Sequence, residues 1–157
     1  MLKAALAHQA RALLLPLLLL TACDGLFTGK QVVRFPLQPV AGGGFAPLRL
    51  TLGPEMNPVT LNFSAEYTAN PAEAGKWNSY VAVLSYQGRG IATGAFNINS
   101  NATPDAPAGA ISVSQTMLLV EAAQTGDYEL NINIAGQPRI TLAHPNVELR
   151  RNIQHGN

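Results

Sequence analysis

Hydrophobic and polar side chains alternate with a period of two along several short segments of the chain. In residues 128–134 every even position is apolar, whereas the odd positions carry Glu or Asn. The same alternation runs through 48–52 and 59–67. Because successive side chains of a strand point to opposite faces of a sheet, this pattern predicts half-buried β-strands.

Further strands are predicted from short apolar segments that are bounded by Gly, Pro or Asn. These segments are 31–37, 79–86, 91–98, 111–121 and 139–143, the last with an extension through 147–149. With the alternating segments they make seven or eight strands, and no convincing helical pattern interrupts them. Short strands of this number, separated by turn signals, are typical of a two-sheet antiparallel sandwich.

Glycine-containing segments are expected to connect the strands. Residues 87–90 predict a tight hairpin, because glycine readily adopts the positive φ that such turns require. Residues 135–138 predict a second hairpin connection. Longer loops are expected at 41–44, 68–76 and 99–109, and the last two have room to carry binding residues.

Two local motifs resemble features of immunoglobulin-like or fibronectin-like sandwiches. Trp77 stands just ahead of one predicted strand, and a Thr-Gly-Asp-Tyr sequence ending at Tyr128 follows another strand and a turn. The second motif resembles a tyrosine corner, which implies that the ring lies in the core and the hydroxyl bonds to backbone upstream. The inter-sheet cysteine pair of antibody domains is missing, and a transthyretin-like sandwich would give nearly the same pattern. We therefore expect an all-β immunoglobulin-like or transthyretin-like sandwich, a fold that by itself implies no function.

The N-terminal segment differs from this pattern. Lys3 and Arg11 precede an apolar run at 12–20. Its last residue, Leu20, begins the tetrapeptide Leu20-Thr21-Ala22-Cys23. The tetrapeptide resembles the lipobox of bacterial lipoproteins, and Cys23 is the only cysteine of the chain. The apolar run is about half the roughly 20 residues that a spanning helix needs, which favours a signal peptide. The alternatives are an ordinary secretory signal, in which the cysteine is incidental, and a short buried helix of a cytosolic protein.

The lipobox resemblance implies a modified N-terminus at Cys23. Signal peptidase II would cut before this residue, its thiol would receive a diacylglycerol, and its new amino group would take a fatty acid such as palmitate. Two or more acyl chains are enough for stable membrane anchoring. Asp24 resembles the signal that keeps lipoproteins of the enteric type on the inner membrane. The expected location is therefore the bacterial cell envelope, lipid-anchored and facing the periplasm, with Asp24 favouring the inner membrane.

This interpretation divides the chain into four segments. They are a lipoprotein signal peptide at 1–22, a lipidated N-terminus and tether at 23–31, a β-sandwich domain at 32–150, and a flexible polar tail at 151–157. The formal net charge is +1 for the whole chain and only 12% of the residues are charged, so the composition gives no sign of nucleic-acid binding.

Residues with catalytic or metal-binding chemistry are few. His144 precedes a proline at a predicted strand bend, where we expect a surface or turn role, and His155 lies in the polar tail. Asp127 and Glu129 would share one face of a strand as paired carboxylates do, but the simpler interpretation is a solvated outer face. No serine stands in a Gly-x-Ser-x-Gly motif. We therefore predict no catalytic residues, no metal site and no cofactor, although a serine–histidine hydrolase that uses His144 stays open as a remote alternative.

Two tyrosines form the candidate partner surface. If Val81 and Val83 point inward, Tyr80 and Tyr86 face outward and offer apolar area with a polar tip. If Leu84 points inward instead, the two tyrosines belong to the core.

The expected function is that of a non-enzymatic accessory or assembly protein. Its partners would be the membrane, through lipid on Cys23, and an envelope protein, through protein–protein contacts. The alternative is a ligand-binding module for a glycan, a peptide or a small molecule, which would use its loops and Tyr80 or Tyr86.

Overall fold

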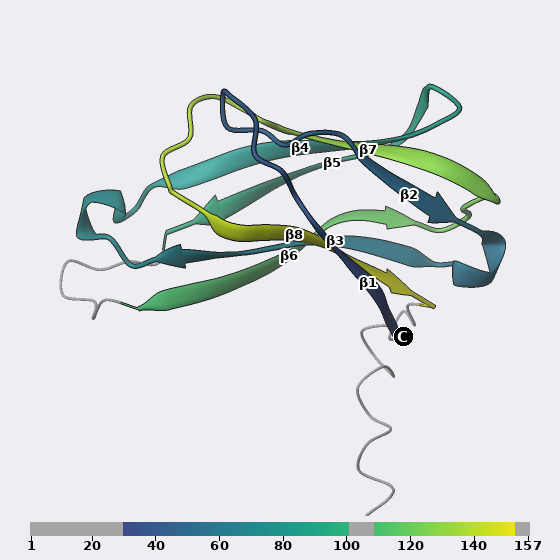
Figure 1. The fold of residues 1–157 in the computed structure, drawn as a ribbon, viewed down its shortest axis with the longest axis horizontal. Helices are drawn as coiled ribbons and strands as arrows, with labels where there is room; N and C mark the ends of the chain where they lie inside the picture. The colour runs from purple at the N-terminus through teal and green to yellow at the C-terminus, as the bar shows by residue number, and fades with distance from the viewer. Residues whose placement is uncertain (1–29, 101–108, 153–157) are drawn as a thin grey trace, which may run out of the picture.

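A computed structural model describes residues 30–100 and 109–152 of the chain. The predicted signal peptide, Cys23, Asp24 and His155 lie outside the described residues. Within them the chain forms eight β-strands and two short 3-10 turns, Pro54–Met56 and Pro71–Glu73 (Figure 1). The strands are β1 (Lys30–Pro36), β2 (Leu48–Leu52), β3 (Val59–Thr68), β4 (Trp77–Tyr86), β5 (Arg89–Asn99), β6 (Ala110–Val120), β7 (Gly126–Ile134) and β8 (Ala143–Arg151). None of the helices among the described residues has the length and apolar character to cross a membrane.

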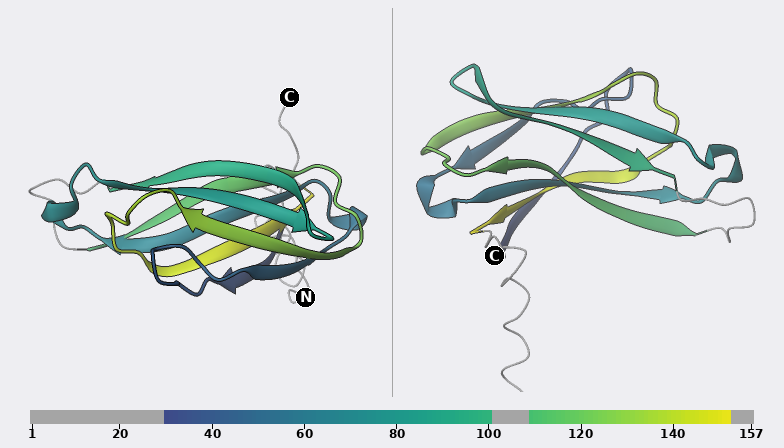
Figure 2. Two further views of the ribbon diagram at one scale, coloured as in Figure 1. Left: turned by 90° about the horizontal axis from the view of Figure 1, so that it is seen from above. Right: turned by 180° about the vertical axis from the view of Figure 1, so that it is seen from behind.

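The strands form two antiparallel sheets that pack face to face (Figures 1 and 2). The strand order is β1-β8-β3-β6 in one sheet and β2-β7-β4-β5 in the other. The predicted two-sheet antiparallel sandwich is therefore confirmed. The pairs are nested, because β4 pairs with β5, β3 with β6, β2 with β7 and β1 with β8, and this nesting defines a jelly roll. It differs from the ABED and CFG sheets of immunoglobulin constant domains.

The alternation seen in the sequence matches the two faces of each sheet. In β3, Leu61 and Phe63 point into the core, whereas Asn62 and Ser64 point outward. The centre of the core is a group of aromatic rings whose centroids lie 5.2–5.8 Å apart. These rings belong to Phe45, Phe63, Tyr80 and Phe96. Burying each large apolar side chain contributes about 1.5–3 kcal/mol, so this inner layer is the main source of stability.

The β4–β5 connection is the hairpin that the sequence predicts. Gln87 and Gly88 form its two-residue loop, with φ of 50° and 76°. Both values lie in the left-handed region that such hairpin turns require. The prediction of a second hairpin at 135–138 is wrong, because β7 and β8 belong to different sheets and the chain crosses between them here.

The strand predicted at 139–143 is wrong for a related reason. Ile140 is buried, as an apolar strand residue would be, but its backbone N–H donates to the side chain of Asn78 rather than to a neighbouring strand. Strand β8 begins only at Ala143 and runs through the segment that was predicted as an extension. The apolar pattern therefore predicts a strand at a place where a side-chain amide, and not a neighbouring strand, binds the buried backbone.

Candidate functional site

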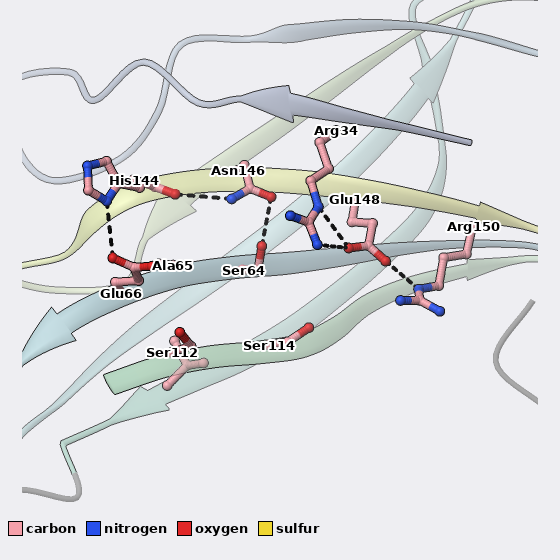
Figure 3. A pocket seen from close by; sticks show the side chains of 11 residues that line it. Arg34, Ser64, Ala65, Glu66, Ser112, Ser114, His144, Asn146, Glu148 and Arg150 are labelled. Carbon is pink, nitrogen blue, oxygen red and sulfur yellow. Dashed lines mark hydrogen bonds and ion pairs between the residues drawn. The ribbon is translucent and has the colours of Figure 1, made fainter. Parts of the chain in front are cut away.

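A shallow polar groove lies on the outer face of the β1-β8-β3-β6 sheet, with a volume of about 360 Å³ (Figure 3). All four strands contribute outward side chains to it. Arg34 comes from β1, Ser64 and Glu66 come from β3, and Ser112 and Ser114 come from β6. The remaining polar side chains belong to β8. Because every contribution sits on a strand of one sheet, the backbone fixes the spacing of these groups.

One end of the groove contains a buried carboxylate held by two arginines. Glu148 is only 5% exposed although it points to the outer face. Arg34 lies opposite it in the β1–β8 ladder, and its Nε and Nη2 both donate to Oε2 of Glu148 at 3.2 Å. Arg150 donates from Nε to the other carboxylate oxygen. Charge-assisted bonds of this kind compensate the desolvation of the carboxylate, and they fix both guanidinium groups in place.

The other end of the groove is a chain of polar contacts around His144. Nδ1 of its ring lies 3.2 Å from Oε2 of Glu66, and its backbone carbonyl oxygen accepts a bond from Nδ2 of Asn146 at 3.1 Å. Oδ1 of Asn146 accepts a bond from the hydroxyl of Ser64 at 2.7 Å. His144 is exposed and has φ of 50°, so the structure places it at a surface bend. Its ring contacts a carboxylate, and Ser64 donates to an amide, so these two residues do not form a serine–histidine pair.

Polar and charged groups contribute more of the groove's lining than apolar atoms do. Hydroxyl and amide groups line its middle, and the two arginines exceed Glu148 by one positive charge at one end. None of the described residues that line it is Phe, Tyr or Trp. No group of three potential metal-ligating side chains occurs within 30–100 and 109–152. The arrangement suits recognition of an extended polar surface.

Tyr80 belongs to the core and is removed from the candidate partner surface. It is 3% exposed, and its ring stacks on those of Phe63 and Phe96. Leu84 also points inward, so the structure has the second of the two orientations considered for β4. Burial raises the pKa of Tyr80 above its ordinary value of 10.0, and a hydrogen bond with Asn78 partly offsets this rise.

Tyr86 remains half-buried at one end of the sandwich. Its ring stacks on that of Tyr128 with 4.7 Å between centroids, and its hydroxyl donates to the carbonyl oxygen of Thr125 at 3.2 Å. The ring lines a pocket of about 440 Å³. Ile91 and Leu119 also line it, and they are 45% and 39% exposed. Tyr86 therefore borders the more apolar of the two sites described so far.

The paired carboxylates at Asp127 and Glu129 lie on the outer face of the second sheet. Both are exposed, whereas Tyr128 between them is buried. Asp127 accepts a bond from the hydroxyl of Thr51 at 2.9 Å, and Glu129 accepts one from Nδ2 of Asn131 at 3.0 Å. This is the solvated outer face that the alternation predicts.

Two buried polar residues were missed by the sequence analysis. Asn78 is 1% exposed and holds the 139–140 backbone, and Glu148 is the centre of the arginine pair. The period-two pattern places Asn78 on the same face as Tyr80, and this was the one available signal of its burial. Glu148 stands on the polar face of β8, so nothing in the pattern distinguishes it from a solvated residue.

Comparisons with known proteins add no functional information. No protein family matches the sequence, and no curated protein matches it. Among solved structures, the chain is similar to dimeric latent PorU from Porphyromonas gingivalis, at 12% sequence identity and a TM-score of 0.34. The similarity covers 82% of this chain and 13% of PorU. At this level it carries no inference about function.

Proposed function

We propose that the protein is a lipid-anchored, periplasm-facing lipoprotein that works without catalysis, as an accessory or assembly protein of the bacterial cell envelope. Its groove on the β1-β8-β3-β6 sheet docks on another envelope protein. The signal-peptide pattern and the resemblance to a lipobox at Cys23 support the anchor, and the groove supports the docking.

The observation that carries the docking role is the pair of arginines that share Glu148 at one end of the groove. Arginine is enriched at protein–protein interfaces and is frequent among the residues that dominate binding. Side chains that are already fixed before binding lose less conformational entropy when a partner arrives. Both Arg34 and Arg150 are bonded to Glu148, which limits the geometries in which the groove presents them.

The length of the tether adds a second argument. Strand β1 begins at Lys30, seven residues after Cys23. Seven residues span at most about 25 Å when fully extended. A lipid on Cys23 would therefore keep the domain close to the membrane surface, where an envelope partner is within reach.

The anchor is tested by mass spectrometry of the protein from the membrane fraction. We expect an N-terminus at Cys23 that carries acyl chains, and we expect the Cys23→Ser variant to lack them. An unmodified Cys23 in a membrane-free protein would contradict the anchor.

The docking surface is tested with a photo-crosslinking amino acid in the full-length, C-terminally tagged chain in its native host. One variant carries the crosslinker in place of Glu66 in the groove, and the matched control carries it in place of Asn97, which is exposed on the other sheet. We expect one envelope protein to be captured in stoichiometric amount from position 66 and not from position 97. The capture should be lost when Cys23→Ser is added. Equal capture from both positions, or capture of abundant envelope proteins alone, would rule out docking through the groove.

A second candidate function rests on the end pocket beside Tyr86. Its volume of about 440 Å³ and its exposed Ile91 and Leu119 suit a ligand with an apolar portion, from a glycan, a peptide or a small molecule. The hydrophobic dye anilinonaphthalene sulfonate serves as the probe. We expect the dye to bind the folded protein and Leu119→Arg to reduce that binding, whereas Val40→Arg, at an exposed apolar residue that does not line the pocket, should not. Equal binding by both variants would count against a ligand site here.

A further inference from the structure

Basic residues gather where β1 begins and β8 ends, side by side at one end of the β1-β8-β3-β6 sheet (Figure 1). These two strands carry four basic residues and one acidic residue, whereas the other described residues carry four basic and six acidic ones. We call the four basic residues the basic patch, namely Lys30, Arg34, Arg150 and Arg151. With Glu148 and the exposed Glu55 of the neighbouring 3-10 turn, this end still has four positive charges against two negative ones.

Arg151 is a cation for which the fold supplies no counter-ion. No acidic side chain within 30–100 and 109–152 forms an ion pair with it. It is partly exposed, and its buried Nε has no hydrogen-bond acceptor in the described part of the chain. In the β1–β8 ladder it lies opposite Lys30, a second cation. Like charges opposite each other destabilise a sheet, so an anion from outside the fold would relieve this pair.

The chain that leads to Cys23 joins the domain at this patch. Lys30 is the first residue of β1 and follows Cys23 by seven residues. Acyl chains on Cys23 would therefore hold Lys30 within about 25 Å of the lipid headgroups. A short tether keeps the effective concentration of the membrane surface high, so a weak attraction is enough to hold the patch on it.

We propose that the basic patch rests on anionic phospholipid headgroups of the membrane that holds the anchor. This inference rests on the proposed anchor at Cys23 and not on docking through the groove. Each cation close to an anionic surface strengthens binding about fivefold, which corresponds to about 1 kcal/mol. Val33, which is 42% exposed on β1, adds apolar area that suits the headgroup boundary.

Such a contact would orient the groove relative to the membrane. The groove follows β8 from His144 to Arg150, and Arg151 is the next residue of the strand. With the patch on lipid, the arginine end of the groove lies at the membrane surface and the His144 end lies farther out. Arg151 is not among the described residues that line the groove, so the lipid contact and the docking can be tested separately.

The test uses the full chain, purified with its acyl chains and reconstituted in vesicles, after mass spectrometry has shown the chains on Cys23. A nitrobenzoxadiazole label is attached to Val33→Cys beside the patch, or to Thr93→Cys, the matched control at an exposed position of the other sheet. The vesicles contain phosphatidylcholine with phosphatidylglycerol, and a lipid with a nitroxide in its headgroup quenches the label. We expect strong quenching at position 33 and weak quenching at position 93. Vesicles of phosphatidylcholine alone, or high salt, should remove the difference.

Charge-neutral variants test the two cations outside the groove. Lys30→Gln together with Arg151→Gln should reduce the ratio of lipid-bound to free patch about 25-fold, at about fivefold for each cation. Lys76→Gln together with Arg89→Gln removes two exposed cations elsewhere and should leave the quenching unchanged. The comparisons of lipid and salt keep the patch intact, so they decide the matter even if the Arg151 variant does not fold.

The inference is overturned if the label at position 33 is quenched equally in neutral and anionic vesicles. It is also overturned if the patch variant loses photo-crosslinking from position 66 while its quenching stays unchanged, because the patch would then bind an acidic protein. A preparation without acyl chains would contradict the anchor, and this inference with it. Acylated protein whose label does not respond to the lipid charge would contradict the lipid contact alone.

Discussion

The phenol oxygen of Tyr128 binds both backbone polar groups of Gln124. Its hydroxyl donates to the carbonyl oxygen at 2.9 Å, and it accepts from the backbone N–H at 2.8 Å. The ring itself is buried. This is the geometry of the tyrosine corner that the sequence resemblance implies, and it ties the β6–β7 turn to the core although the fold is a jelly roll.

Tyr128→Phe is expected to lower the free energy of unfolding by about 1–3 kcal/mol, because it leaves the backbone groups of Gln124 without their partner while keeping the ring. Chemical denaturation measures this change. Tyr86→Phe is the control, since its hydroxyl makes one longer bond, to Thr125, and should cost less than about 1 kcal/mol. Equal losses in the two variants would contradict the corner.

Asn78→Ala is expected to release the segment that precedes β8. The Asn78 side chain accepts bonds from the backbone N–H groups of Arg139 and Ile140 at 2.7 Å and 3.0 Å, and it donates to the carbonyl oxygen of Ile140 at 2.8 Å. Hydrogen exchange at these two amides should accelerate, with a loss of stability of about 1–3 kcal/mol for each buried group left unsatisfied. Ser79→Ala, at the neighbouring outward position, should leave both amides protected. Unchanged exchange in Asn78→Ala would disprove the role of this side chain.

Gly94→Ala tests the close contact between β5 and β6. The added methyl group meets the backbone carbonyl oxygen of Met117, which is buried in β6, so we expect a loss of about 1–3 kcal/mol, as for other overpacked sites. Gly90→Ala is the matched control on the same strand, because its added Cβ would lie 3.7 Å from Val83, at ordinary contact distance. Thermal unfolding of the two variants compares them. A stable Gly94→Ala would show that the strands are further apart than described.

The burial of Tyr80 leads us to expect that the free energy of unfolding decreases at high pH. Burial raises its pKa in the folded protein, whereas in the unfolded chain it titrates near its ordinary value of 10.0. Above that pH the unfolded chain has lost a proton that the folded protein still holds, so the free energy of unfolding falls as the pH rises. Denaturation midpoints between about pH 8 and 11 should fall less steeply in Tyr80→Phe than in the unmodified protein. A Tyr80→Phe slope equal to that of the unmodified protein would refute the prediction.

The strands were predictable where one face of the sheet is apolar and the other polar. In β3 the alternation from Val59 to Tyr67 matches the observed strand almost to the residue. In β4 both faces are apolar, so the local pattern did not decide whether Tyr80 faces in or out. The aromatic neighbours that bury it come from three other parts of the chain.

The groove was not predictable from local pattern for a similar reason. Glu148 stands at a polar position of the alternating pattern, as a solvated residue would. Its burial depends on Arg34, which lies 114 residues away in the sequence. For the same reason the sequence does not predict which sandwich topology the chain adopts. Alternation indicates which face of a strand is buried, but it does not indicate which strands are its neighbours. Tyr128 was predictable because its partner, Gln124, is only four residues upstream.

The nested pairing of the strands makes the last strand a requirement for completing the first sheet. Strand β8 lies between β1 and β3, so β1 has no neighbour in its sheet until the final strand is present. Chains are synthesised from the N-terminus, and pairing between strands distant in sequence is slow. Strand β1 therefore cannot pair within its sheet until nearly the whole domain has been synthesised. A first strand that stays unpaired for this time is compatible with export in an unfolded state, and the first sheet is completed only when residues 143–151 are present.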